Sequence, residues 1–157
     1  RGNVETRLRK LAEGVAQATF LAAAGLHRLG LADRITSLVS IDEMLPAVAQ
    51  GAIGIEIRGD DRATAGLVAA IHHGETGIAV SCERAFLAAL DGSCRTPIGG
   101  HARLLPTREL HLTGLVARED GSFLLKRALH GVKDDAERIG LELGRSLRMD
   151  SPSDIFA

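Results

Sequence analysis

Residues 110–129 read LHLTGLVAREDGSFLLKRAL, and this stretch decides the fold of the C-terminal half. Apolar side chains alternate with polar or small ones on both sides of its middle: Leu110, Leu112 and Val116, then Phe123, Leu125 and Leu129. Such alternation is typical of strands that bury one face. Asp120-Gly121 stands between the two runs and is a strong signal for a hairpin turn. The stretch therefore predicts two antiparallel strands.

Helical patterns lie on both sides of this hairpin. Upstream, a helical stripe that runs from Thr76 is made of Ile78, Cys82, Ala85, Phe86 and Ala89. Downstream, residues 132–147 carry a second stripe made of Val132, Ala136, Ile139, Leu143 and Leu147. Residues 92–100 are rich in small side chains and predict a loop. Helix, loop, two or three antiparallel strands and helix make a small α+β domain, which we assign to residues 74–157.

The first 73 residues predict an α/β region instead. Asn3 is a suitable N-cap for a helix whose apolar stripe is Val4, Leu8, Leu11 and Val15. Residues 18–22 fit a short buried strand, and residues 51–58 fit a second strand. Residues 63–73 predict an alanine-rich helix that ends at Gly74, where we expect the boundary between the two domains.

Composition excludes several classes of protein. The chain has 157 residues, enough for one compact domain or two small ones. Its formal net charge of -1 argues against a nucleic-acid or membrane-surface binder, which would carry a basic excess. No apolar run approaches the roughly 18 residues of a membrane span, and the N-terminus has no apolar signal-peptide core. We therefore expect a cytoplasmic protein that binds neither membrane nor nucleic acid.

The two cysteines, Cys82 and Cys94, differ in their surroundings. Their spacing contains no C-x-x-C, and the histidines form no H-x-x-x-H or H-E-x-x-H pattern, so we expect no metal site. Cys82 lies on an apolar helical stripe, where a cysteine usually acts as a small core residue. Cys94 lies in the small-residue loop beside Arg95, and a neighbouring cation favours the reactive thiolate. An exposed loop cysteine without a role is the alternative interpretation of Cys94.

The basic residues are mostly arginine, with 16 Arg and 3 Lys. The guanidinium group binds carboxylates and phosphates in a bidentate way, although a GC-rich genome would explain the excess equally well. Arg1, Arg7 and Arg28 lie at helix entries or turns of the predicted α/β layer, where open-sheet proteins bind ligands. Three such arginines suit a ligand with several carboxylates. The alternative is that each is an ordinary solvated surface residue.

Five motifs occur in order along the chain: RGNVETRL at 1–8, AGLHRLG at 24–30, LPAVAQGAIGIE at 45–56, ERAFL at 83–87 and GSCRTPIG at 92–99. In these motifs the chain strongly resembles the porphobilinogen deaminase family, also called hydroxymethylbilane synthase. The resemblance implies a transferase that joins four porphobilinogen units, with loss of ammonia, into hydroxymethylbilane for tetrapyrrole (heme) biosynthesis.

The resemblance also implies a fold. Family members have two periplasmic-binding-protein-like α/β domains around a cleft, and a third α+β domain that carries a cysteine on a loop. Residues 1–73 would then be the remainder of the second domain together with the segment that returns to the first domain. Residues 74–157 would be the C-terminal α+β domain with its antiparallel sheet.

The family's functional residues carry over to named positions. By resemblance, Cys94 holds the dipyrromethane cofactor through a thioether. Arg1, Arg7 and Arg28 match arginines that bind the carboxylates of cofactor and substrate. Gln50 and Gly51 match substrate-binding residues in the cleft, beside a departure from the family pattern, since Ala49 stands where glycine is usual.

The family's first domain and its catalytic aspartate belong upstream of Arg1 by this resemblance. We therefore expect the 157-residue chain alone to be inactive, and the intact protein to be a monomer whose partners are porphobilinogen and the growing pyrrole chain. The alternative function is a non-catalytic module that binds anions or tetrapyrroles, which the arginines and Cys94 would also permit.

Overall fold

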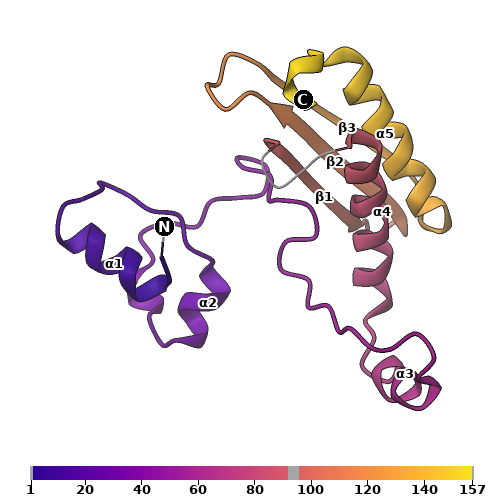
Figure 1. The fold of residues 1–157 in the computed structure, drawn as a ribbon, viewed down its shortest axis with the longest axis horizontal. Helices are drawn as coiled ribbons and strands as arrows, with labels where there is room; N and C mark the ends of the chain where they lie inside the picture. The colour runs from indigo at the N-terminus through magenta and orange to yellow at the C-terminus, as the bar shows by residue number, and fades with distance from the viewer. Residues whose placement is uncertain (1, 92–95, 157) are drawn as a thin grey trace. The chain divides into compact units, whose positions relative to one another are not determined.

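The structure is a computed structural model that describes residues 2–91 and 96–156. It divides into two units, Arg1–Ser40 and Ile41–Ala157. The helices and strands are labelled in Figure 1. Two of the predicted site residues, Arg1 and Cys94, lie outside the described residues.

The first unit contains helices α1 (Val4–Ala12) and α2 (Ala23–Arg28) and the 3-10 helix η1 (Ala32–Arg34). The Asn3 side chain accepts a hydrogen bond from the Thr6 amide at 2.9 Å, which confirms the predicted N-cap. The helix ends sooner than its apolar stripe predicts, because the chain turns at Gly14 with φ of 71°. Val15 is consequently exposed.

The strand predicted at residues 18–22 is wrong. This segment is irregular, and Phe20 is exposed. A strand must exchange backbone hydrogen bonds with a neighbouring strand, and every strand in the described part of the chain lies between Ile98 and Val132. The apolar run therefore has no strand to pair with among the described residues, and it is not buried.

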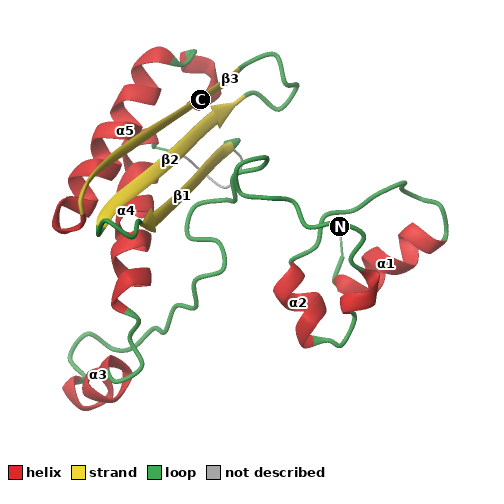
Figure 2. Ribbon diagram, turned by 180° about the vertical axis from the view of Figure 1, so that it is seen from behind, coloured by secondary structure: helices red, strands yellow, loops and turns green. Residues whose placement is uncertain are grey.

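The second unit contains a sheet with helices on one side. Its elements are α3 (Arg62–Ala69), α4 (Gly74–Leu90), β1 (Ile98–Leu104), β2 (Glu109–Ala117), β3 (Leu124–Val132), α5 (Ala136–Asp150) and the 3-10 helices η2 (Lys133–Asp135) and η3 (Ser153–Phe156). The sheet has the order β1-β2-β3 and is antiparallel throughout. Helices α4 and α5 lie side by side against one face of it (Figures 1 and 2). This arrangement confirms the predicted α+β domain.

Three boundaries differ from the prediction. The helical stripe predicted at 132–147 begins later, because Val132 is the last residue of β3 and is exposed, while α5 begins at Ala136. The loop predicted at 92–100 ends earlier, because Ile98 already pairs with Val116 as the first residue of β1. Helix α3 ends at Ala69 rather than at residue 73, and His73 instead caps α4 by accepting from the Thr76 amide.

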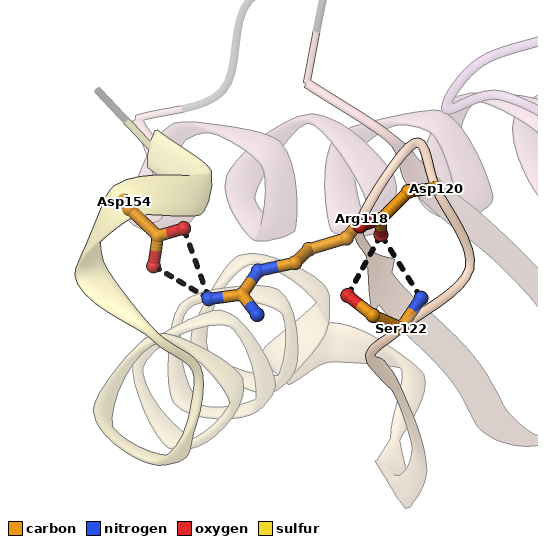
Figure 3. Close-up of polar contacts among 4 residues, drawn as sticks. All are labelled: Arg118, Asp120, Ser122 and Asp154. Carbon is orange, nitrogen blue, oxygen red and sulfur yellow. Dashed lines mark hydrogen bonds and ion pairs between the residues drawn. The ribbon is translucent and has the colours of Figure 1, made fainter.

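The predicted hairpin is confirmed at its turn (Figure 3). The Arg118 amide donates to the Phe123 carbonyl at 2.9 Å and closes the loop between β2 and β3. One Asp120 oxygen accepts from the Ser122 amide at 2.9 Å and from its hydroxyl at 2.7 Å, while Gly121 adopts φ of 74°. The Arg118 guanidinium points to Asp154, whose two oxygens each lie 2.9 Å from Nη2. This ion pair links the hairpin to η3.

The core lies between the two long helices and the sheet. Its fully buried members come from α4, β2 and α5: Cys82, Phe86, Leu90, Leu110, Leu112, Val116, Ile139 and Leu147. The helices approach closely because α5 presents glycines to α4. A Cβ added at Gly140 would lie 2.2 Å from the Cys82 carbonyl oxygen, and one at Gly144 would lie 2.6 Å from the Ala89 Cβ. The prediction that Cys82 is a core residue is confirmed.

The strand predicted at 51–58 is also wrong. Residues 52–58 form no helix or strand, and Ile53 is 91% exposed. Alternating isoleucines predict a strand, but no described strand lies beside them to accept their hydrogen bonds. The α/β layer expected for residues 1–73 is therefore not found in the described residues, which give that region helices and irregular segments. None of the described helices is long and apolar enough to span a bilayer.

Candidate functional site

Arg7 projects from α1 toward the segment that precedes α2. Its Nε donates to the Gly2 carbonyl at 3.1 Å, and its Nη1 donates to the Phe20 carbonyl at 3.0 Å. The side chain is half-buried. Because a guanidinium has five N–H donors, these two bonds orient the group and leave donors for an anion. Arg7 is therefore a fixed cation rather than a freely rotating surface residue.

Arg28 belongs to the same unit as Arg7 and is the last residue of α2. Its side chain is exposed. A cation at this position complements the negative end of the helix dipole, which accounts for its placement without a ligand. It is also open to an incoming carboxylate.

Gln50 and Gly51 belong to the second unit and lie in a tight turn. The Gln50 amide donates to the Ala47 carbonyl at 3.1 Å, and the Ala52 amide donates to the Ala49 carbonyl at 3.3 Å. Two residues of this turn have positive φ, namely Ala49 at 58° and Gly51 at 85°. Gln50 and Gly51 are both exposed, so the turn presents them to solvent.

A buried carboxylate holds this turn. Glu83 on α4 is 6% exposed, and its Oε2 accepts from the Ala49 amide at 2.6 Å. Its Oε1 accepts from the Ala102 amide of β1 at 2.7 Å. Sequence reasoning assigned Glu83 no role. The sequence pattern that could have indicated a role is its spacing: Glu83 lies three residues before Phe86 and seven before Leu90. This spacing puts a carboxylate inside an apolar helical stripe.

Cys82 is excluded as a reactive thiol. Burial and the neighbouring Glu83 carboxylate raise the pKa of Cys82 to about 12, so the thiolate is scarcely populated near neutral pH. Among the described residues, no three or more His, Cys, Asp or Glu side chains gather where they could hold a metal ion.

Two family models match the chain in sequence. Residues 1–66 match "Porphobilinogen deaminase, dipyromethane cofactor binding domain", and residues 78–149 match "Porphobilinogen deaminase, C-terminal domain". The chain belongs to the porphobilinogen deaminase family. The resemblance seen in the motifs is thus confirmed, and the family's cofactor, dipyrromethane, is the one that the motifs implied.

The sequences of individual porphobilinogen deaminases are similar to this chain over most of its length. The chain is 54% identical over 148 residues to the porphobilinogen deaminase of Nitrobacter hamburgensis, which covers 94% of this chain and 46% of the relative. It is 52% identical over 156 residues to that of Paracoccus denitrificans, with 99% and 50% covered. It is 52% identical over 149 residues to "Porphobilinogen deaminase, chloroplastic" of Pisum sativum, with 94% and 40% covered. The chain spans about half the length of these relatives.

The residue types on the described surface fit the porphobilinogen deaminase cofactor. Each pyrrole of a dipyrromethane carries an acetate and a propionate, and carboxylates are the groups that guanidinium binds best. The first unit offers Arg7, oriented by backbone carbonyls, and the exposed Arg28. The donor set is therefore chemically suited to a polycarboxylate.

Proposed function

We propose that this chain is the C-terminal part of a hydroxymethylbilane synthase, a transferase that joins four porphobilinogen units with loss of ammonia. The observation that carries the proposal is the match of both family domains, in order, over most of the chain. The product, hydroxymethylbilane, is linear and serves tetrapyrrole biosynthesis. We further propose that the intact protein is a monomer, and that the rest of the enzyme supplies the catalytic aspartate.

We propose a domain boundary at residue 74. The family matches support it, because one ends at residue 66 and the other begins at residue 78. Helices α4 and α5 and the sheet share one hydrophobic core, against which Val48 of the preceding region also packs. Residues 1–73 would then form the cleft region. The structure's own division falls after Ser40 and groups residues 41–73 with the α+β part.

Cys94 is the proposed attachment point of dipyrromethane. Of the two cysteines, Cys82 is buried with a raised pKa, which makes it unsuited to form a thioether with a cofactor. When bound, the cofactor supplies the acceptor pyrrole to which porphobilinogen is added. The protein's part at this position is to provide a nucleophilic sulfur whose sequence neighbours are small residues.

Arg1, Arg7 and Arg28 are the proposed carboxylate-binding residues for cofactor and substrate. Arg7 has the best support, because its two backbone contacts hold the guanidinium before an anion arrives. A charge-assisted hydrogen bond contributes about 1.5–3 kcal/mol, so loss of one arginine should weaken binding severely without always abolishing it. Gln50 and Gly51 are the proposed substrate-binding residues of the second unit.

A chimera tests the proposal. The N-terminal half of the Paracoccus denitrificans relative is joined to this chain, and consumption of porphobilinogen is measured for the chimera and for the 157-residue chain alone. We expect turnover from the chimera and none from the chain. Intact mass and peptide mapping should then find a dipyrromethane adduct on the Cys94 peptide of the chimera, and none in Cys94→Ser.

Three outcomes would contradict the proposal in different ways. An inactive but folded chimera would argue against an enzyme part. Tight binding of linear tetrapyrroles by the chain, with no turnover from the chimera, would favour the non-catalytic binding module. Turnover by the chain alone would show that the catalytic group lies within its 157 residues.

A further inference from the structure

We propose that Glu83 is a positioning residue that holds the Gln50–Gly51 turn in its substrate-binding conformation. This inference rests on the proposed function, because it concerns a turn to which substrate binding has been assigned. Glu83 would act through the backbone rather than by touching substrate, since both of its oxygens accept hydrogen bonds from amides.

The two contacts join distant parts of the chain. Ala49 lies 34 residues before Glu83, and Ala102 lies 19 residues after it. The distances of 2.6 and 2.7 Å are short for hydrogen bonds from an amide N–H to an oxygen. Because Glu83 is 6% exposed, little water competes for its oxygens. A carboxylate so placed fixes the turn against β1.

The segment before the turn also lies directly on β1. The Gly100 amide donates to the Pro46 carbonyl at 3.0 Å. A Cβ added at Gly99 would lie 3.0 Å from the Leu45 Cβ, and one at Gly100 would lie 3.0 Å from the Val48 Cγ2. The strand therefore needs small residues here to let the segment approach. β1 begins four residues after Cys94 in the sequence, so one carboxylate holds both the turn and the first strand that follows Cys94.

Backbone strain explains why the turn needs a carboxylate. Ala49 has φ of 58°, in the left-handed region that favours glycine. A non-glycine residue keeps such a conformation only where its surroundings hold it there. The amide that Glu83 binds is that of Ala49 itself. The hydrogen bond to Glu83 therefore acts directly on the strained residue, which lies immediately before Gln50.

Glu83→Gln is the sharpest variant. Glutamine keeps the size of the side chain but has one acceptor oxygen, and its NH2 group would face an amide that also donates. In the 157-residue chain, hydrogen exchange measured by NMR should show protection of the Ala49 and Ala102 amides falling by about tenfold or more. Protection of the Leu112 amide in β2 should stay unchanged. The matched control is Glu75→Gln, an exposed glutamate on the same helix, which should alter neither amide.

The chimera provides the functional readout. Glu83→Gln should raise the KM for porphobilinogen by about tenfold while kcat changes much less. Adding Ala49→Gly should recover several-fold of that loss, because glycine adopts the left-handed conformation without a restraint. A merely structural role would lower the yield of folded protein but leave KM unchanged and would not be rescued by Ala49→Gly.

The outcomes separate this inference from the function on which it rests. Unchanged protection at Ala49 in Glu83→Gln would overturn the positioning role. Lost protection with unchanged KM would also overturn it, because the turn would then not serve substrate binding, while the activity of the chimera would stand. An inactive chimera would overturn the proposed function, and the exchange result would still report whether Glu83 holds the turn.

Discussion

Gly140→Ala is the substitution that tests the packing of the α+β domain most directly. The added Cβ would lie 2.2 Å from the Cys82 carbonyl oxygen and 2.8 Å from the Phe86 amide nitrogen. Both are backbone atoms of α4, so no side chain can rotate away. The two helices would have to move apart along the contact that buries Phe86.

The expected cost follows from two opposing effects. Alanine is a better helix former than glycine by up to about 1 kcal/mol. Overpacking a close contact costs about 1–3 kcal/mol or more, and a clash with backbone lies at the upper end of that range. We expect a net loss of about 2 kcal/mol in the free energy of unfolding. For a domain of this size that corresponds to a fall in Tm on the order of 10 °C.

Thermal unfolding followed by circular dichroism measures the effect. Gly66→Ala is the matched control, because Gly66 is also helical, in α3, and an added Cβ there meets nothing within 4 Å. The control should keep or slightly raise the Tm. An unchanged Tm for Gly140→Ala would refute the close approach of α4 and α5.

Three further predictions concern single residues. Because Cys82 is buried and its pKa is raised to about 12, iodoacetamide at pH 8 should leave it unmodified in the folded chain and label it after denaturation, as peptide mapping would show. Burial and the nearby Arg103 lower the pKa of His111 below the ordinary 6.5, so below that pH the unfolded chain binds more protons than the folded chain. The free energy of unfolding measured in urea should therefore fall as pH drops below about 6.5, and His111→Gln should reduce that fall. Asp154→Asn removes the Arg118 ion pair, and because both groups are partly exposed it should cost at most about 1 kcal/mol in urea unfolding.

The parts of the fold that the sequence predicts correctly find the partners of their backbone hydrogen bonds nearby in the chain. The hairpin around Asp120 and Gly121 joins two strands that pair with each other, so alternation and turn chemistry together determine it. The helix that carries Cys82 and Phe86 packs on the sheet and on α5, which lie farther along the chain, but its backbone hydrogen bonds close within its own segment. Local pattern and tertiary contact agree here, which is why pattern alone is sufficient.

The failed strand predictions have a common physical origin. Residues 18–22 and 51–58 have the apolar character of strands, yet alternation reports only which faces a strand would bury. It does not provide the neighbouring backbone that a strand requires, and neither segment pairs with a strand of the described sheet. Ile53, at 91% exposed, shows the consequence.

The candidate site divides in the same way. Arg7, Arg28 and Gln50 could be proposed as site residues from sequence, because each lies within a short motif. The role of Glu83 could not, because its contacts are to residues 34 and 19 positions away. Only the folded chain shows which amides a buried carboxylate meets.

Glu83 and Ala49 each break a local rule, and they meet in one hydrogen bond. Glu83 puts a carboxylate into an apolar stripe, and Ala49 puts a methyl-bearing residue at φ of 58°. Either exception alone would lower stability, since buried charge needs partners and left-handed backbone favours glycine. The Ala49 amide donates to the Glu83 carboxylate at 2.6 Å, so each residue gives the other a partner. Local violations that compensate each other are expected at functional sites, so the coincidence at Ala49 is itself a reason to look for substrate binding at the neighbouring Gln50.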